Sequence, residues 1–280
     1  MGLVHAPRGR TVGTVLVGLT LTLAVLVAAA RATTEAERYY LALGDSIAYG
    51  IQPTKVRPGA RPSDFDTGYV DVLAARLRKR SPGLQVVNYG CPGESTVTFS
   101  RGGCPAVADR VKLHDAFRGS QLAAALAFLP AHPGAVSPIT LTLFGNDWLP
   151  FVLDTCKGGA ACVRKRGPAA IAAFGTRLAS IVRQLRAAAP DAEIVVTGAW
   201  NPIPSQLRPF EPIYRSLETS IVRAATPSHA RVAKMLPVFN PSAKTQARLC
   251  ALTFICSKGD PHPTDAGYRA IADAVHRAIR

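Results

Sequence analysis

Short apolar segments alternate along this chain with longer stretches whose apolar residues recur every three or four positions. The short segments have the length and composition of buried strands, and they are Tyr39–Leu43, Leu84–Asn88, Ile139–Phe144, Glu193–Thr197 and Ala230–Met235. The longer stretches predict helices from Gly68, over 121–129, 169–188 and 211–225, and from near Thr264. Strands separated by helices of this length pair in parallel, with helices on both faces. The pattern therefore predicts an α/β protein with a mainly parallel, five-stranded sheet.

The first 32 residues have the pattern of a secretory signal peptide. Two arginines precede an apolar run from Val12 to Ala30, and Ala30-Arg31-Ala32 is a small-x-small cleavage pattern. A retained membrane anchor is the alternative interpretation, because the run approaches the ~20 residues that span a bilayer. We expect residues 1–32 to be a signal peptide, residues 33–280 to form the mature domain, and the protein to be secreted.

The chain has an excess of basic residues, which indicates what kind of partner it would attract. Lys and Arg number 33 against 18 Asp and Glu, a formal charge of +15, and removal of 1–32 takes away three arginines and no acid, so 15 − 3 leaves +12. Such a charge favours an anionic lipid or cell-wall surface. Apart from short clusters at 76–80 and 164–166, the basic residues are dispersed and not interleaved with aromatics. Nucleic acid is therefore not an expected partner.

Six cysteines fall into couples that are close in sequence. The couples are Cys91 with Cys104, Cys156 with Cys162, and Cys250 with Cys256. Six cysteines allow fifteen pairings, so this pairing is inferred from proximity alone. Disulfides are the natural interpretation in an exported chain. A zinc site is the alternative, but the chain has no C-x-x-C and no nearby His at ligand spacing, so no metal is expected.

Polar residues follow the predicted strands. Gly44-Asp45-Ser46 follows the first, Gly90-Cys91-Pro92-Gly93 the second and Gly145-Asn146-Asp147 the third, while Asp260-Pro261-His262 precedes the last helix. In parallel sheets, ligands bind beyond the carboxyl ends of the strands. A hydroxyl, an imidazole and several hydrogen-bond donors could therefore meet at one edge, which is the set of groups that acyl transfer needs.

Four motifs in this order resemble the sequence blocks of the SGNH, or GDSL, hydrolases. They are GDSIAYG from Gly44, Gly90, the GND of 145–147, and DPHPTDAGY ending at Tyr268. They span nearly the whole predicted mature domain, and NYGCPGEST with Cys104 downstream is similar to the secreted actinobacterial branch. The resemblance implies a flavodoxin-like three-layer α/β/α sandwich. The absence of a G-x-S-x-G elbow counts against the α/β-hydrolase fold.

The resemblance also implies the roles of individual residues. Ser46 would be the nucleophile and His262 its general base, with no metal or cofactor. The oxyanion hole would consist of the backbone N–H of Ser46, the backbone N–H of Gly90 and the side-chain amide of Asn146.

The acid of the implied triad departs from the family pattern. The family usually has an Asp three residues before the His, where this chain has Gly259, and Asp260 is two residues before it. Either Asp260 orients the imidazole of His262, or a backbone carbonyl does so and the enzyme works as a Ser-His dyad.

Aromatic residues after the third and fourth strands are expected to wall the pocket: Trp148, Phe151 and Trp200. The chain is thus predicted to be a secreted, monomeric serine esterase that hydrolyses lipid or small acyl esters. Two alternatives stay open. One is a carbohydrate O-acetylesterase acting on cell-wall or extracellular polysaccharide, and the other is a non-catalytic binding protein on the same fold.

Overall fold

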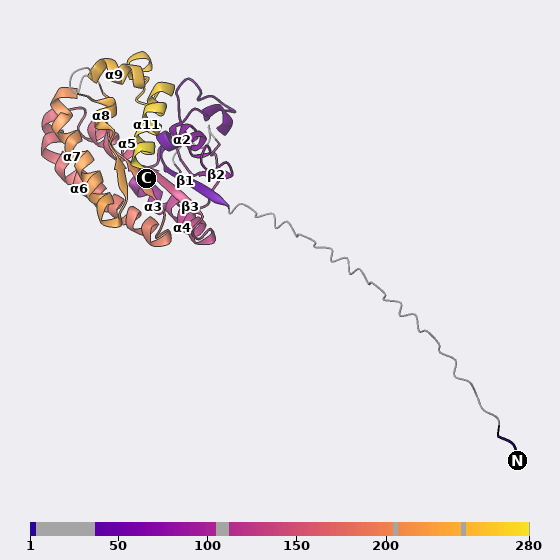
Figure 1. Ribbon diagram of the computed structural model, residues 1–280. Coiled ribbons are helices and arrows are strands. Elements are labelled where there is room, and N and C mark those ends of the chain that lie inside the picture. Colours follow the sequence, from indigo (N-terminus) through magenta and orange to yellow (C-terminus); the bar gives the residue numbers. More distant parts are fainter. Residues whose placement is uncertain (4–36, 105–111, 204–206, 242–244, 280) are drawn as a thin grey trace. The chain divides into compact units, whose positions relative to one another are not determined.

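The computed structural model describes residues 1–3, 37–104, 112–203, 207–241 and 245–279 (Figure 1). Nearly all of the predicted signal peptide, 1–32, lies outside the described residues. Residues Glu35–Arg280 form one compact unit, distinct from Met1–Thr34, and this unit contains all of the helices and strands that the structure describes. Within the described part of the chain, no helix is long and apolar enough to cross a membrane.

Parallel strands form a single five-stranded sheet. The strands are β1 (Arg38–Gly44), β2 (Leu84–Asn88), β3 (Val136–Thr142), β4 (Ile194–Thr197) and β5 (Arg231–Ala233), in the order β2-β1-β3-β4-β5. This order confirms the predicted flavodoxin-like architecture. The chain steps from β1 to β2 and then returns past β1 to β3, so its direction along the sheet reverses between β1 and β3.

Long helices cover the two faces of the sheet (Figure 1). α2 (Tyr69–Leu77) packs against α11 (Asp265–Ala278), whereas α6 (Ala160–Ala188) packs against both α4 (Gln121–Ala131) and α7 (Leu207–Ala225). Right-handed crossovers explain why the helices divide between the two faces of the sheet. The β1–β2 connection runs in the opposite direction along the sheet from the later connections, so its helix, α2, lies on the opposite face from α4, α6 and α7. The central strands are therefore buried on both faces.

Short helices occupy the loops between these elements. They are α1 (Ser46–Tyr49), η1 (Pro62–Phe65), α3 (Thr96–Arg101), α5 (Gly145–Pro150), η2 (Phe151–Thr155), η4 (Thr226–Ser228), α8 (Leu236–Phe239), α9 (Thr245–Leu252) and α10 (Ile255–Lys258). Most span one or two turns, which is too short for an apolar period to appear in the sequence. α6 also begins earlier than the predicted 169, because Val163 and Gly167 are buried. Packing there extends the helix through Pro168.

A buried hydroxyl network fastens α2 to the sheet. The Tyr69 hydroxyl lies 3.2 Å from Oγ1 of Thr140 and 3.0 Å from Oγ1 of Thr142, and the Tyr40 hydroxyl lies 2.9 Å from Thr140. Burial raises the pKa of Tyr69 to about 12, so the phenol stays neutral and able to donate. These bonds hold α2 over β1 and β3 without an unpaired polar group at any of the four positions.

Gly44 ends β1 at a point where its backbone lies close against β3. It pairs in register with Thr142, and its φ of 130° lies in the region that favours glycine. A Cβ added at Gly44 would overlap the backbone carbonyl of Thr142. The glycine therefore lets the segment leading to Ser46 leave the sheet directly beside β3.

Gly44→Ala should destabilise the fold more than an alanine at a glycine that is open to solvent. Gly134 also has a positive φ, of 70°, but a Cβ there meets nothing within 4 Å. We expect Gly134→Ala to cost about 1 kcal/mol from backbone strain, and Gly44→Ala at least about 3 kcal/mol because a steric overlap is added. Urea unfolding measures both. Equal costs would show that the β1–β3 contact yields at Gly44.

Candidate active site

Three side chains from two distant parts of the sequence form one line of hydrogen bonds. Nε2 of His262 lies 2.9 Å from the Ser46 hydroxyl, and Nδ1 lies 2.7 Å from Oδ1 of Asp260. When Nδ1–H donates to the carboxylate, Nε2 is left as an acceptor for the serine proton. This arrangement can raise the nucleophilicity of a hydroxyl.

Asp260 reaches the imidazole although it is only two residues before it. Its Oδ1 also accepts the backbone N–H of His262 at 2.8 Å, an Asx-type turn that folds the carboxylate back towards the ring. Burial raises the pKa of Asp260, but the hydrogen bonds and charge of His262 outweigh it, and the net pKa is lowered. Of the two groups considered for orienting His262, the carboxylate is thus the one in contact with Nδ1.

Ser46 opens α1, and Asp45 caps this helix. Asp45 Oδ1 accepts the Ile47 N–H at 2.9 Å, and the Asp45 N–H donates to the carbonyl of Thr142 at 3.1 Å. Burial, aided by the charge of Asp147, raises the pKa of Asp45 to about 7 against the opposing bond from Ile47. The carboxylate next to Ser46 therefore serves the helix turn, while the partner of His262 is Asp260.

The segment that carries His262 is fixed by the residues where α9 ends and α10 begins. The carbonyl of His262 accepts the Phe254 N–H at 3.0 Å, and the Thr264 N–H donates to the carbonyl of Leu252 at 2.9 Å. The disulfide Cys250–Cys256 links α9 to α10 on either side of Leu252 and Phe254. Thr264 then caps α11 by accepting the N–H of Gly267.

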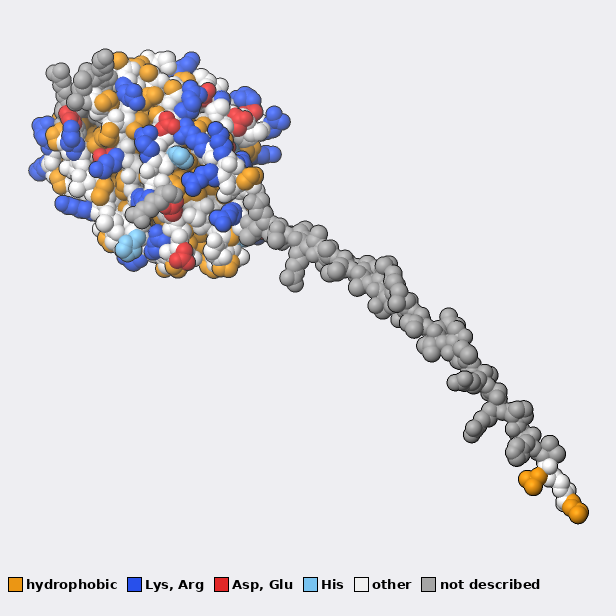
Figure 2. All heavy atoms as spheres, in the orientation of Figure 1, with side chains coloured by type: hydrophobic (Ala, Val, Ile, Leu, Met, Phe, Trp, Pro, Cys, Tyr) orange, Lys and Arg blue, Asp and Glu red, His pale blue; other side chains and the backbone are white. Residues whose placement is uncertain are grey.

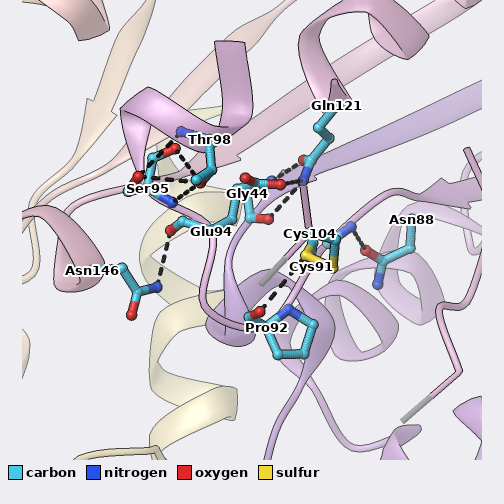
Figure 3. Close-up of a disulfide and its surroundings, with 11 residues drawn as sticks. Gly44, Asn88, Cys91, Pro92, Glu94, Ser95, Thr98, Cys104, Gln121 and Asn146 are labelled. Atoms are coloured by element: carbon cyan, nitrogen blue, oxygen red, sulfur yellow. Dashed lines mark hydrogen bonds between the residues drawn. A yellow bond between two sulfur atoms is a disulfide. The ribbon is translucent and has the colours of Figure 1, made fainter. Parts of the chain in front are cut away.

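Asn146 is held by the loop after β2. Its Nδ2 donates one hydrogen to the backbone carbonyl of Glu94 at 2.9 Å, as Figure 3 shows. An amide nitrogen carries two hydrogens, so one remains for a ligand. Asn146 lines the same cavity as Ser46 and His262.

The structure does not bring Gly90 into this cavity. Its N–H donates to Oδ1 of Asn88 at 2.9 Å, and an added Cβ would meet the backbone of Tyr49, so this glycine serves the packing of α1. Gly93 lines the cavity instead, with φ at 88°. Within the described residues, the Gly93 N–H has no acceptor. The Pro92-Gly93 dipeptide, typical of a turn that needs positive φ at its glycine, is the sequence signal for it.

The cavity beside Ser46 has a volume of about 500 Å³ and mostly apolar walls. Its apolar lining residues are Ile47, Ile51, Pro53, Val56, Pro92, Phe144, Leu149, Trp200, Pro202 and Pro261. Among the described residues that line it, none is Lys or Arg. Its size and composition are typical of a pocket that takes an apolar group next to a few polar ones.

Of the aromatic residues predicted to wall the pocket, only Trp200 does so. Trp148 is buried in the core, with ring centroids 5.2 Å from Phe151 and 6.0 Å from Tyr214. The reason is that α5 begins directly at Gly145, so successive side chains turn around a helix. Leu149 faces the cavity where the sequence suggested Trp148.

Residues 42–270 match the model of the GDSL-like lipase/acylhydrolase family. The chain belongs to this family. It is a carboxylic ester hydrolase. No curated protein matches the chain.

Solved structures of the same fold include several esterases. A lipase from a goat rumen metagenome is 15% identical, with a TM-score of 0.58 over 86% of this chain and 97% of that one. Phospholipase A1 from Streptomyces albidoflavus is 20% identical, with a TM-score of 0.54 over 87% of this chain and 100% of that one. An acetylxylan esterase from Geobacillus stearothermophilus is 17% identical, with a TM-score of 0.52 over 86% of this chain and 93% of that one. At these identities the likeness concerns the fold of the GDSL-like hydrolase.

Two buried polar residues in this GDSL-like hydrolase could not be found from the sequence. The Gln121 side chain bonds both the N–H and the carbonyl of Gly44, and also donates to Glu94 Oε2 at 3.1 Å (Figure 3). It thereby ties the loop before Ser46 to the loop that holds Asn146. Glu94 is 1% exposed, and burial raises its pKa to about 7. Gln and Glu in polar segments usually lie on the surface, so the sequence carries no signal for either.

The disulfides of the GDSL-like hydrolase are the couples expected from their proximity. Cys91–Cys104, Cys156–Cys162 and Cys250–Cys256 have Cα–Cα distances of 5.8, 5.5 and 5.2 Å. In the described part of the chain, no group of His, Cys, Asp or Glu side chains is placed to hold a metal ion.

Glu94→Gln should stabilise the protein at pH 8 and not at pH 5. A carboxyl whose pKa rises from 4.5 unfolded to about 7 folded binds more protons in the folded state between these values, so its contribution to stability falls as pH rises through this range. Glutamine imitates the protonated form. We expect the variant to gain about 2 kcal/mol over wild type between pH 5 and pH 8.

The measurement is urea unfolding at the two pH values, with Glu211→Gln at an exposed glutamate as the control. A gain that is the same at both pH values would mean that Glu94 is not protonated in the folded protein near neutral pH.

Proposed function

We propose that this hydrolase is a serine esterase in which Ser46 is the nucleophile, His262 the general base and Asp260 the group that orients the imidazole. The observation that carries the proposal is the continuous line of hydrogen bonds from Asp260 through His262 to the Ser46 hydroxyl, at the mouth of an apolar cavity. A serine hydroxyl becomes an effective nucleophile when a neighbouring base takes its proton.

The reaction then runs in two half-reactions. Oγ of Ser46 attacks the ester carbonyl carbon while Nε2 of His262 takes the hydroxyl proton. The bond to the alcohol breaks, and the alcohol leaves with the proton from Nε2. Water next attacks the acyl-serine and gives its proton to the same nitrogen. Release of the carboxylic acid restores Ser46, with the proton returned from His262.

The negative charge of each tetrahedral intermediate falls on the former carbonyl oxygen. The donors we assign to it are the N–H of Ser46, the N–H of Gly93 and the second amide hydrogen of Asn146. Gly93 replaces Gly90 in this set, because the Gly90 N–H is already donated to Asn88. Donors fixed in advance are worth more than donors that must reorient during the reaction.

The cavity supports an ester with an apolar acyl group as the substrate. Apolar walls and the lack of a basic side chain among the described lining residues suit a hydrocarbon chain better than an anionic group. Basic residues are spread instead over the outer surface, as the face drawn in Figure 2 illustrates. Together with the charge of +12 on the mature chain, they would favour an anionic lipid or cell-wall surface around the ester.

Secretion is supported by the disulfides. Structural disulfides persist in oxidising compartments outside the cytosol, and this hydrolase has three. Residues 1–32 would be the signal peptide that directs export.

Hydrolysis of p-nitrophenyl esters from acetyl to palmitoyl tests the proposed activity and substrate. We expect kcat/KM to rise beyond acetyl, because each buried methylene adds about 0.8 kcal/mol of binding. Ser46→Ala is the control and should be inactive. An optimum at acetyl would favour the carbohydrate O-acetylesterase, and ester binding without any turnover would identify a binding protein.

Substitutions in the site should lower kcat by factors that follow the role of each group. We expect His262→Ala to abolish hydrolysis, Asp260→Ala to lower kcat by a smaller factor, and Asn146→Ala to lower kcat by about 10²- to 10³-fold. Steady-state kinetics on the best ester measures all three. An Asp260→Ala enzyme with unchanged kcat would mean that another group orients the imidazole.

A further inference from the structure

The loops that carry Gly93 and Asn146 are joined side by side at two points. Asn146 Nδ2 donates to the Glu94 carbonyl at 2.9 Å, and the Thr96 N–H donates to Oδ2 of Asp147 at 2.8 Å. Two of the three assigned oxyanion donors therefore depend on one pairing between segments 94–96 and 146–147.

A guanidinium from a third element, the helix α6, bonds both of these loops. Arg177 lies in α6, 30 residues after Asp147. Its Nε donates to Oγ1 of Thr96 at 2.7 Å, and its Nη2 donates to Oδ1 of Asp147 at 3.1 Å. The Thr96 hydroxyl in turn donates its proton to Asp147 Oδ1. The side-chain oxygens of Thr96 and Asp147 thus all have partners, and the ring forms only while the two loops lie next to each other.

Burial makes the ring dependent on Arg177. Thr96 is fully buried and the Asp147 side chain is 4% exposed, whereas the Arg177 side chain is 38% exposed and reaches in from the surface. Without Arg177, the Asp147 carboxylate would be a buried charge with no cation paired to it in the described part of the chain. Such a charge is costly, and the loop would move to expose it to water.

The position of this charge also matters for the chemistry. Asp147 is next in sequence to Asn146 and close enough to Asp45 to raise its pKa. An unpaired carboxylate here would oppose the negative charge that forms on the substrate oxygen. Pairing with a guanidinium removes most of that opposition.

We propose that Arg177 is a positioning residue for the oxyanion hole, acting on Asn146 and Gly93 through Asp147 and Thr96. The inference rests on the proposed function. It requires the effect of Arg177 to appear in the transition state, where the oxyanion exists, and hardly at all in the binding of the ester.

Arg177→Met keeps the aliphatic stem and removes the guanidinium. We expect kcat to fall about 10- to 100-fold, as displaced donors do, with KM within about twofold of wild type. The affinity for an alkylboronic acid, whose serine adduct is tetrahedral and anionic, should weaken by a similar factor. Arg183→Met on the same helix is the matched control, because Arg183 bonds only Ser180 among the described residues, at 3.4 Å.

Thr96→Val provides a second variant in case Arg177→Met folds poorly. Valine has nearly the shape of threonine but cannot link the guanidinium to Asp147, so the same fall in kcat is expected, whereas Thr96→Ser should keep the link and the activity. Active-site titration with a fluorophosphonate counts the folded, reactive enzyme, so lost stability cannot be mistaken for lost kcat.

The outcomes separate the two proposals. Unchanged kcat per titrated site in both Arg177→Met and Thr96→Val, or a rise in KM with unchanged kcat, would overturn the role of Arg177 while leaving the esterase intact. Wild-type protein that hydrolyses no ester, or a Ser46→Ala variant that retains turnover, would instead overturn the proposed function on which this inference rests.

Discussion

The parallel pairing of β1 with β3 is the constraint on which the rest of this molecule depends. At this point the chain reverses its direction along the sheet, so two strands far apart in sequence end side by side, with Gly44 in register with Thr142. Ser46 and Asn146 follow directly from these ends. Open α/β sheets leave a crevice where the direction reverses, and the groups of the site gather there. The β2 loop and the segment before α11 then only have to reach this crevice, and Gln121 and the α9–α10 segment hold them in place.

Each of the three residues assigned to the proposed oxyanion hole has an acidic neighbour in sequence, and each of these acidic side chains has different surroundings. Asp45 caps a helix, with burial raising its pKa to about 7; Glu94 is buried against Gln121 with a similar pKa; Asp147 is paired with Arg177. Burial of Asp45 and Glu94 and the ion pair of Asp147 each lessen the negative charge that would oppose the oxyanion. The carboxylate with a lowered pKa, Asp260, lies on the far side of the imidazole, where a negative charge stabilises the protonated ring.

The sheet and its long helices could be predicted because each leaves a local mark in the sequence. The roles proposed for Ser46 and His262 are implied by the resemblance of their motifs to the family, whereas Asp260 departs from the family spacing, and the structure brings all three side chains into hydrogen-bond contact. Buried strands are apolar runs, long helices have a period, and the motifs lie where the strands end. What could not be predicted depends on contacts between distant segments. Gly90 and Gly93 are both glycines in one short loop, and only the partner of each N–H tells them apart. Trp148 and Leu149 are adjacent, and the start of α5 decides which one faces the cavity. Glu94, Gln121 and Arg177 have ordinary surface identities until folding surrounds them.

Each disulfide lies beside a different loop at the edge that carries the proposed site, and Cys91 and Cys156 are themselves buried. Cys91 is two residues before Gly93, Cys156–Cys162 joins the end of the α5–η2 segment to α6, and Cys250–Cys256 closes the segment against which His262 is paired. Bridges spanning 13, 6 and 6 residues each contribute about 2–3 kcal/mol by restricting the unfolded chain, which together is a large share of the stability of a single domain. They also order the edge where the loops meet. Reduction of these bridges would therefore have two consequences at once, because it would lower the stability of the whole sandwich and free the loops that carry Gly93 and His262.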